Sequence, residues 1–269
     1  MRIALKIAYI GTDYHGSQVQ PDVKTIEGEL FRALRELNII NDTREANFSA
    51  AGRTDSGVHA LGQVIAFDTD KPHITIPRAV NSKLPRTIWA WSRAQVPSDF
   101  DPRRNAKYRE YRYIIFGKYD LPLLLKASRL LTGEHDFYNF ITPEKDRSNI
   151  CDIEKLEMRV AGECTIMDIR AGHFLWHMVR KIAAAMKMVG VGEKDLTWLE
   201  KMLNPSEFRE GLEPAPAYGL IFKNVEYENI TWDEDAYAKK SISKALDEHF
   251  LRHKVMAQMI EEFKKGLAD

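Results

Sequence analysis

Apolar and polar residues alternate along the first strand that the sequence predicts, which runs from Arg2 to Tyr9. A helix is predicted next, with Thr25 as its N-cap and Leu37 near its end, because apolar residues recur there every three or four positions. Two acidic residues, Glu27 and Glu29, fall near the positive end of that helix. Alternation and Pro77 then predict strands over Ala46–Ala50, Gln63–Asp68 and Ile88–Val96, and a short helix from Pro77 toward Lys83.

The segment Pro97–Pro102 holds two prolines and two acidic residues, which indicates a connector rather than the interior of an element. After it, Lys107–Phe116 alternates cleanly and predicts a long strand. The remaining pattern predicts helices over Leu121–Leu131, Phe174–Val189 and Leu196–Leu203, strands over Ile153–Val160, Cys164–Ile169 and Leu220–Tyr227, and a helical tail over Asp235–Leu267.

The connector divides the chain into an N-terminal part, residues 1–104, and a C-terminal part, residues 105–228. Residues 229–269 form an amphipathic helical extension, which we expect to pack on the C-terminal part. One side of this helix carries Ile242, Leu246, Phe250, Ile260, Phe263 and Leu267.

Charge is balanced over the whole chain, with 39 basic and 39 acidic residues, which by itself argues against a protein that approaches phosphates. Between Arg78 and Tyr113, however, nine basic residues face only three acidic ones. Either these residues form one basic face or they are spread over several solvated surfaces. The two cysteines, Cys151 and Cys164, lie in strand-like segments, so we expect free thiols and an intracellular protein. No stretch reaches membrane-spanning length.

The loop Gly52-Arg53-Thr54-Asp55-Ser56-Gly57 carries the candidate chemistry, because it places a guanidinium, a carboxylate and two hydroxyls between two apolar strands. Its glycines allow positive φ values and the close approach of another backbone. A surface turn in which Asp55 or Thr54 caps the next segment is an equally good interpretation of this loop alone.

Four motifs, in order, give the chain its resemblance to the tRNA pseudouridine synthase A family. Gly52–His59 matches the signature Gly-Arg-Thr-Asp-x-Gly-Val-His, and Lys107–Tyr113 is similar to the second motif of the family. Phe174–Arg180 resembles the third motif and Pro214–Leu220 the last. The resemblance extends from Ile3 to about Tyr227. It implies an α+β fold of two similar halves, whose mixed or antiparallel sheets join across a central RNA-binding cleft.

The resemblance also implies a function and its residues. The family isomerises uridines 38, 39 and 40 of the tRNA anticodon stem-loop to pseudouridine, and we expect a cytoplasmic homodimer that uses no cofactor, nucleotide, metal or membrane. Asp55 corresponds to the catalytic nucleophile, Tyr111 to the tyrosine that faces the base, and Arg180 to a cation beside Asp55. The other substrate-binding residues implied are Arg53, which supports the stem or contacts a phosphate, Leu220 in the pocket wall, and His59.

These residue types suit the reaction, which breaks the N1–C1′ bond of uridine, turns the base and rejoins it through C5. An ionised carboxylate can start it by attacking C1′, by adding to C6, or by removing a proton from C2′, and the sequence leaves all three open. A base covering Asp55 would disfavour its charged form, so Arg180, three residues after His177 on the predicted helix, could pair with it in two-point fashion. Tyr111 offers a ring for stacking and a hydroxyl for proton transfer at C5.

Two departures and two other functions remain to be weighed. The early loop Gly16–Gln20 lacks the tryptophan that many relatives carry, so no RNA contact is assigned to it. The tail after Tyr227 lies outside the resemblance and could extend an RNA surface or contact a second subunit. A tRNA-binding or RNA-folding module without turnover would not need Asp55, Tyr111 and Arg180 together. A glycosidase would ordinarily need a second carboxylate, which the Asp55 motif lacks.

Histidines elsewhere in the chain do not predict a metal site. His249 and His253 stand four apart, but without the His-Glu-x-x-His pattern, so we expect them to face solvent. His135 has no companion ligand at a recognisable spacing.

Overall fold

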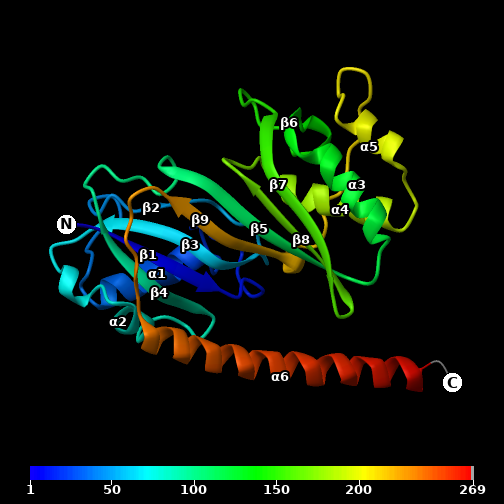
Figure 1. Ribbon diagram of the computed structural model, residues 1–269. Helices are drawn as coiled ribbons and strands as arrows, with labels where there is room; N and C mark the ends of the chain where they lie inside the picture. Colours follow the sequence, from blue (N-terminus) through cyan, green and yellow to red (C-terminus); the bar gives the residue numbers. More distant parts are fainter. Residues whose placement is uncertain (268–269) are drawn as a thin grey trace.

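The computed structural model describes residues 1–267, and one continuous ten-stranded sheet runs through them (Figure 1). One end of the sheet comes mainly from the N-terminal part, with β1 (Arg2–Tyr9), β2 (Ser49–Ala50), β3 (His59–Asp68), β4 (Ile88–Val96) and β10 (Asp233–Glu234). The other end is built from β5 (Ala106–Phe116), β6 (Gly133–Asp136), β7 (Ile150–Ala161), β8 (Cys164–Ala171) and β9 (Leu220–Tyr227).

The order across the sheet is β10-β4-β1-β3-β9-β5-β8-β7-β6, with β2 paired to β3 beside this path. All pairings are antiparallel except the one between β3 and β9, where His59 lies opposite Ile221 and Ala60 opposite Phe222. This short parallel contact joins the two ends of the sheet. The prediction of an α+β fold with mixed or antiparallel sheets is therefore confirmed.

Helices flank both ends of the sheet. They are α1 (Ile26–Glu36), α2 (Pro77–Asn81), α3 (Leu121–Leu131), α4 (Met178–Gly190), α5 (Leu196–Met202) and α6 (Ala236–Gly266), with 3-10 turns η1 (Pro72–Ile74), η2 (Tyr138–Phe140) and η3 (Ala217–Gly219). The predicted N-cap of α1 is confirmed, because the Thr25 hydroxyl accepts the Gly28 N–H at 3.2 Å. In Figure 1, α3, α4 and α5 gather beside β7 and β8, and α3 packs on both β7 and α4.

The first strand is more deeply buried than its alternation predicts. Ile3, Leu5 and Ile7 are fully buried, but the other face of β1 is covered as well. Arg2 begins that face and donates from Nε to the Phe100 carbonyl at 2.6 Å. That face is covered because Ala8 packs with Trp89 and Ile242, and the Lys6 ammonium lies over the rings of Trp91 and Trp232.

The start of α4 differs from the prediction in a way that shapes the site. A helix was expected from Phe174, but α4 begins at Met178 and is preceded by His177 with φ 62°, the left-handed region. Such a conformation costs a residue other than glycine about 1–3 kcal/mol and persists only where surrounding contacts enforce it. Arg180 therefore lies in the first turn of α4, and His177 stands just before that helix rather than within it.

The C-terminal helix α6 does not pack on the C-terminal part, which corrects our expectation. Its first turns contact β4 and α2, where Asp235 caps the helix by accepting the Ala238 N–H and pairs with Arg78 at 3.0 Å. Ile242 is buried in a small cluster with Ala8 and Trp89.

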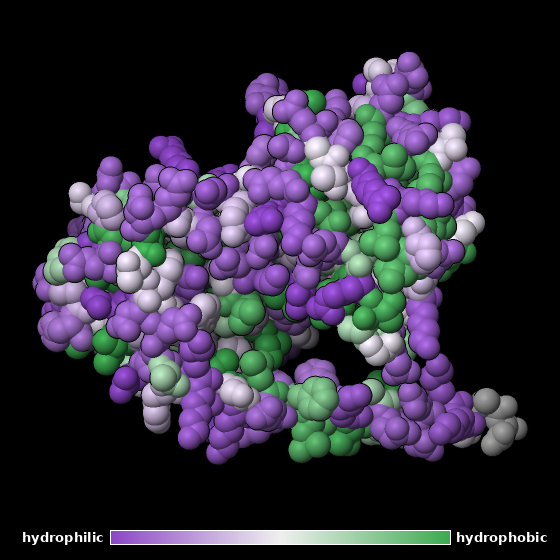
Figure 2. Space-filling model, viewed as in Figure 1, coloured by the Kyte–Doolittle hydropathy of each residue, from purple (hydrophilic) through white to green (hydrophobic). Residues whose placement is uncertain are grey.

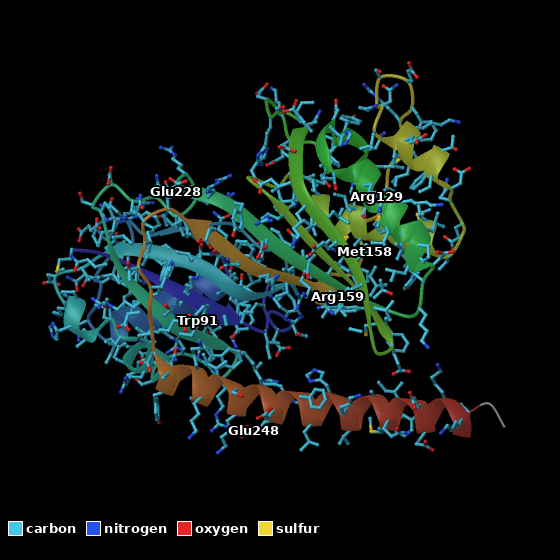
Figure 3. All side chains as sticks on the ribbon, in the orientation of Figure 1. Trp91, Arg129, Met158, Arg159, Glu228 and Glu248 are labelled. Carbon is cyan, nitrogen blue, oxygen red and sulfur yellow. The ribbon has the colours of Figure 1, made fainter. Side chains whose placement is uncertain are left out.

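Beyond this anchor, α6 runs clear of the body. Figure 2 shows an opening beneath the sheet and an apolar patch on the middle of the helix, and in Figure 3 most side chains of α6 stand free, with Glu248 pointing away from the body. The predicted apolar side is thus exposed after Ile242, at Leu246, Phe250, Ile260, Phe263 and Leu267.

Candidate active site

The Gly52–Gly57 loop connects β2 to β3 and is held by buried hydrogen bonds. The Thr54 N–H donates to the Ser17 hydroxyl at 2.9 Å, and the hydroxyls of Thr54 and Tyr9 are 2.8 Å apart. Gly57 has φ 80°, a value that a residue with a side chain rarely adopts. Ser17, in the loop Gly16–Gln20, thus positions the motif.

Asp55 points from this loop to the start of α4. Its Oδ2 accepts a hydrogen bond from Nη1 of Arg180 at 2.9 Å, and its side chain remains 32% exposed. A carboxylate at this end of α4 is also favoured by the helix dipole. The alternative of Asp55 or Thr54 as a local cap is wrong, because the Asp55 carboxylate pairs with Arg180 and the Thr54 hydroxyl with that of Tyr9.

Arg180 donates one hydrogen bond to Asp55 and one to the Pro214–Leu220 segment, rather than two to Asp55. Its Nε donates to the Ala215 carbonyl at 2.7 Å, while Nη1 reaches Asp55. The Ala215 N–H returns a bond to the Arg180 carbonyl at 3.1 Å. The predicted pairing is present, but its two-point geometry is wrong. The guanidinium is instead pre-aligned by the Pro214–Leu220 segment.

His177 is a second neighbour of Asp55, and the sequence analysis gave it no role. Its Nε2 lies 3.5 Å from Asp55 Oδ2, and its Nδ1 lies 2.9 Å from the Thr142 hydroxyl. The Trp176 ring covers it, with the ring centroids 4.8 Å apart. The only signal in the sequence was that His177 belongs to the same motif as Arg180.

Tyr111 and Leu220 form an apolar wall of the site. The Tyr111 ring stacks on Phe222 with centroids 4.7 Å apart and meets the edge of Phe174 at 5.0 Å. Burial raises the pKa of the Tyr111 phenol well above its ordinary range, so the hydroxyl is neutral at physiological pH. Leu220 is buried at the start of β9.

A cleft of about 1540 Å³ brings these residues together and is lined from both parts of the chain. Among the described residues, seven arginines and four acidic side chains line it. The arginines are Arg44, Arg53, Arg103, Arg104, Arg109, Arg147 and Arg180. Of the basic cluster between Arg78 and Tyr113, only three thus reach the cleft, while Arg78 pairs with Asp235 and Arg112 with Asp168. That cluster is therefore divided between the cleft and other surfaces.

Of the two other residues predicted to bind substrate, Arg53 lines the cleft and His59 does not. Arg53 is exposed in the lining of the cleft. Backbone groups contact both nitrogens of the His59 ring. Nδ1 accepts the Gly11 N–H at 3.1 Å, and Nε2 lies 3.2 Å from the Tyr218 carbonyl. His59 therefore braces the loops around the site rather than facing the cleft.

Arg109, next to Tyr111 in the strand, is a buried brace. It donates to the carbonyl groups of Ala51, Gly172 and Arg103, at distances from 2.6 to 3.2 Å. These bonds tie the start of the Asp55 loop to β5 and to the end of β8. Because Nε, Nη1 and Nη2 all donate to carbonyl oxygens, this guanidinium can be buried without a carboxylate partner.

Comparison with known proteins identifies the family of this chain. The model of the pseudouridine synthase family described as "tRNA pseudouridine synthase" matches residues 6–103 and 127–228. The chain belongs to this family. The match spans the Asp55 loop, Arg180 and the Pro214–Leu220 segment, whereas Lys107–Tyr113 lies between the two matched segments. The predicted resemblance to the family is confirmed.

Curated relatives in the family are similar over nearly the whole chain. The tRNA pseudouridine synthase A of Methanosarcina mazei is 53% identical, covering 97% of this chain and 98% of its own. Its counterpart from Archaeoglobus fulgidus is 40% identical over 99% of this chain and 98% of its own. A solved Cbf5-Nop10-Gar1 complex is similar over 70% of this chain and 45% of that chain, with a TM-score of 0.37 and 12% identity, so the assignment rests on the sequence matches.

Within residues 1–267, no group of three or more His, Cys, Asp or Glu side chains could hold a metal ion. None of the helices described is long and apolar enough to cross a membrane.

Proposed function

We propose that this protein isomerises uridine to pseudouridine in the anticodon stem-loop of tRNA, at positions 38, 39 and 40, with Asp55 as its nucleophile. The observation that carries the proposal is the 2.9 Å contact between Asp55 Oδ2 and Arg180 Nη1 inside a cleft rich in arginine. The names of the curated relatives support tRNA as the substrate.

The reaction balances without an oxidant, a reductant or a second substrate. The N1–C1′ bond breaks, a C5–C1′ bond forms, C5 loses its proton and N1 gains one. Asp55 starts it by attacking C1′, by adding to C6 or by removing the C2′ proton, and each route begins from the ionised carboxylate. The fixed guanidinium of Arg180 holds this carboxylate in place beside the cleft.

The cleft suits a nucleotide that has been turned out of its stem. A base within a helical stem is unreachable and must be flipped into a pocket. Tyr111 and Leu220 offer the flipped uracil an apolar wall, and Arg53 stands where it can contact the phosphate beside it. Four exposed arginines of the lining, Arg44, Arg103, Arg104 and Arg147, supply charge for the backbone of the surrounding stem.

Mapping the modified positions tests the substrate part of the proposal. Unmodified tRNA is incubated with the wild type and with Asp55→Asn, and pseudouridine is mapped at single-nucleotide resolution. We expect it at positions 38, 39 and 40 with the wild type alone. Modification elsewhere would contradict the anticodon-arm assignment. Stable binding without modification by either protein would support a binding module, and free uracil would support a glycosidase.

The protein is proposed to act as a homodimer in the cytoplasm, where two subunits hold one tRNA. Support comes from α6, whose apolar side faces water at Leu246 and Ile260 after its anchor at Ile242. A helix with that much apolar surface is stabilised only when a partner covers it. A second copy of the chain offers the same surface and could cover it reciprocally.

A further inference from the structure

The strained backbone at His177 points to a purpose for its side chain. His177 adopts φ 62° immediately before α4, although neither glycine nor asparagine stands there. Such conformations persist where surrounding contacts over-determine them, and they cluster at functional sites. Three contacts hold this residue: the Thr142 hydroxyl, the Trp176 ring and Asp55 Oδ2.

Those contacts select one tautomer of the imidazole. The Thr142 hydroxyl can donate to Nδ1, which leaves the proton of a neutral ring on Nε2. That proton then faces Asp55 Oδ2 at a distance of 3.5 Å between the heavy atoms. The opposite tautomer would direct a lone pair at a carboxylate, which is repulsive. The pKa of His177 is lowered, mainly by burial of the ring, so the ring is neutral near physiological pH.

Both neighbours of Asp55 approach the same oxygen. Arg180 Nη1 lies 2.9 Å from Oδ2, and His177 Nε2 lies 3.5 Å from that atom. Among residues 1–267, no hydrogen bond reaches the other oxygen, Oδ1. One carboxylate oxygen therefore accepts a hydrogen bond from Arg180 and has the His177 ring nearby, while the other oxygen accepts none.

We propose that His177 is a positioning residue that holds Asp55 Oδ2 together with Arg180 and thereby leaves Oδ1 as the reacting oxygen. The inference rests on the proposed function, since it assigns a role to Asp55 in the isomerisation. The hydrogen bond from Arg180 and the nearby Nε2 of His177 both face Oδ2, so rotation of the carboxylate about its last bond would lose both contacts. Small errors in the position of a reacting group are costly, reaching about 100-fold in rate for a shift near 1 Å.

Two substitutions at position 177 separate the donor from the backbone. His177→Asn keeps a side chain that tolerates the left-handed region, but its amide is too short to reach where Nε2 lies. His177→Gln restores an N–H at about the reach of Nε2. We expect His177→Asn to lower the single-turnover rate by up to about 100-fold, with tRNA binding unchanged, and His177→Gln to recover much of that loss. His135→Gln is the matched control, because His135 lies on β6 outside the cleft.

Each outcome bears on the inference separately from the proposed function. No tritium release from C5-labelled tRNA by the wild type would contradict the function itself. Full activity of His177→Asn beside an active wild type would overturn the role of His177 alone. Equal losses in His177→Asn and His177→Gln, in step with a lowered Tm, would show a merely structural residue.

A measurement without turnover tests the same contact. The ¹⁵N shifts of the imidazole report which nitrogen carries the proton. We expect the Nε2–H tautomer in the wild type, and a smaller excess of it in Thr142→Val, where Asp55 alone still favours it. A wild-type ring protonated on Nδ1 would overturn the inference, whether or not the protein is active.

Discussion

Arg180 donates to Asp55 at 2.9 Å across 125 positions of the sequence, and the same guanidinium donates to the Ala215 carbonyl at 2.7 Å. Three motifs that are separate in the chain are therefore joined at one side chain. Because Nε is engaged by a backbone carbonyl, the guanidinium cannot swing away from Asp55 without losing two bonds. This fixed alignment distinguishes it from an ordinary surface ion pair, whose worth is small.

Replacement of Arg180 should impair turnover far more than binding. Arg180→Ala removes the cation beside Asp55, and the loss of one fixed donor in an active site costs roughly 100- to 1000-fold in kcat. Arg180→Lys is the informative comparison, since a lysine keeps the charge but cannot donate to both Ala215 and Asp55 with a planar fork. We expect it to remain well below the wild type in single-turnover assays. Wild-type rates in either variant would remove Arg180 from the site.

The hydroxyl and the ring of Tyr111 should be separable. Tyr111→Phe keeps the stacking on Phe222, and we expect an unchanged Tm with a single-turnover rate at least about 100-fold lower, as for loss of a proton-transfer group. Tyr227→Phe is the control, because its hydroxyl donates to the Pro102 carbonyl away from the cleft. There we expect about 1 kcal/mol less stability and full activity. An unslowed Tyr111→Phe would show that only the ring contributes.

Stability should depend on pH through His177. Burial lowers its pKa in the folded protein despite the opposing charges of Asp55 and Glu213, while Arg180 and Lys181 lower it further. The unfolded chain therefore binds the proton more readily, and this residue destabilises the fold as pH falls below about 6.5. We expect the Tm difference between His177→Gln and the wild type to shift in favour of the variant from pH 7.5 to pH 5.5. A difference that is constant with pH would contradict the lowered pKa.

The proposed dimer can be tested at the exposed side of α6. Leu246→Glu with Ile260→Glu places charges on that side, and we expect the molar mass in solution to fall from twice 31.0 kDa to that of one chain. Lys240→Glu with Lys244→Glu adds as many glutamates to the opposite side and should leave the dimer intact. A wild type that is monomeric at micromolar concentration, or a dimer unaffected by the first pair, would refute the assignment of this surface.

The sequence predicted the long, regular elements well, because their signals are local. The strand over Ile88–Val96 and the helix over Leu121–Leu131 are confirmed at both ends, where Pro97 and the Asp120 cap mark the boundaries. The first residues of β3 were missed, since His59 and Ala60 are extended through pairing with β9, far along the chain. β6 and β10 are short and polar, and they likewise exist through their partners.

The site shows the same division. The motifs identified Asp55 and Arg180, and the structure brings them together. Periodicity wrongly extended α4 back to Phe174, because the left-handed turn at His177 depends on Thr142, Trp176 and Asp55, contacts that no local pattern encodes. The apolar stripe of α6 correctly predicted a helix but not what it packs on, since amphipathicity does not name a partner.

Tritium release by Asp55→Asn tests the central claim most directly. The wild type and the variant are each incubated with unmodified tRNA carrying tritium at C5 of uridine, and binding is measured in parallel. Because forming the C5–C1′ bond expels the C5 hydrogen, each turnover releases one label to water. We expect release by the wild type only, with tRNA binding largely kept by Asp55→Asn. Equal release by both proteins would contradict the assignment of Asp55 as the nucleophile.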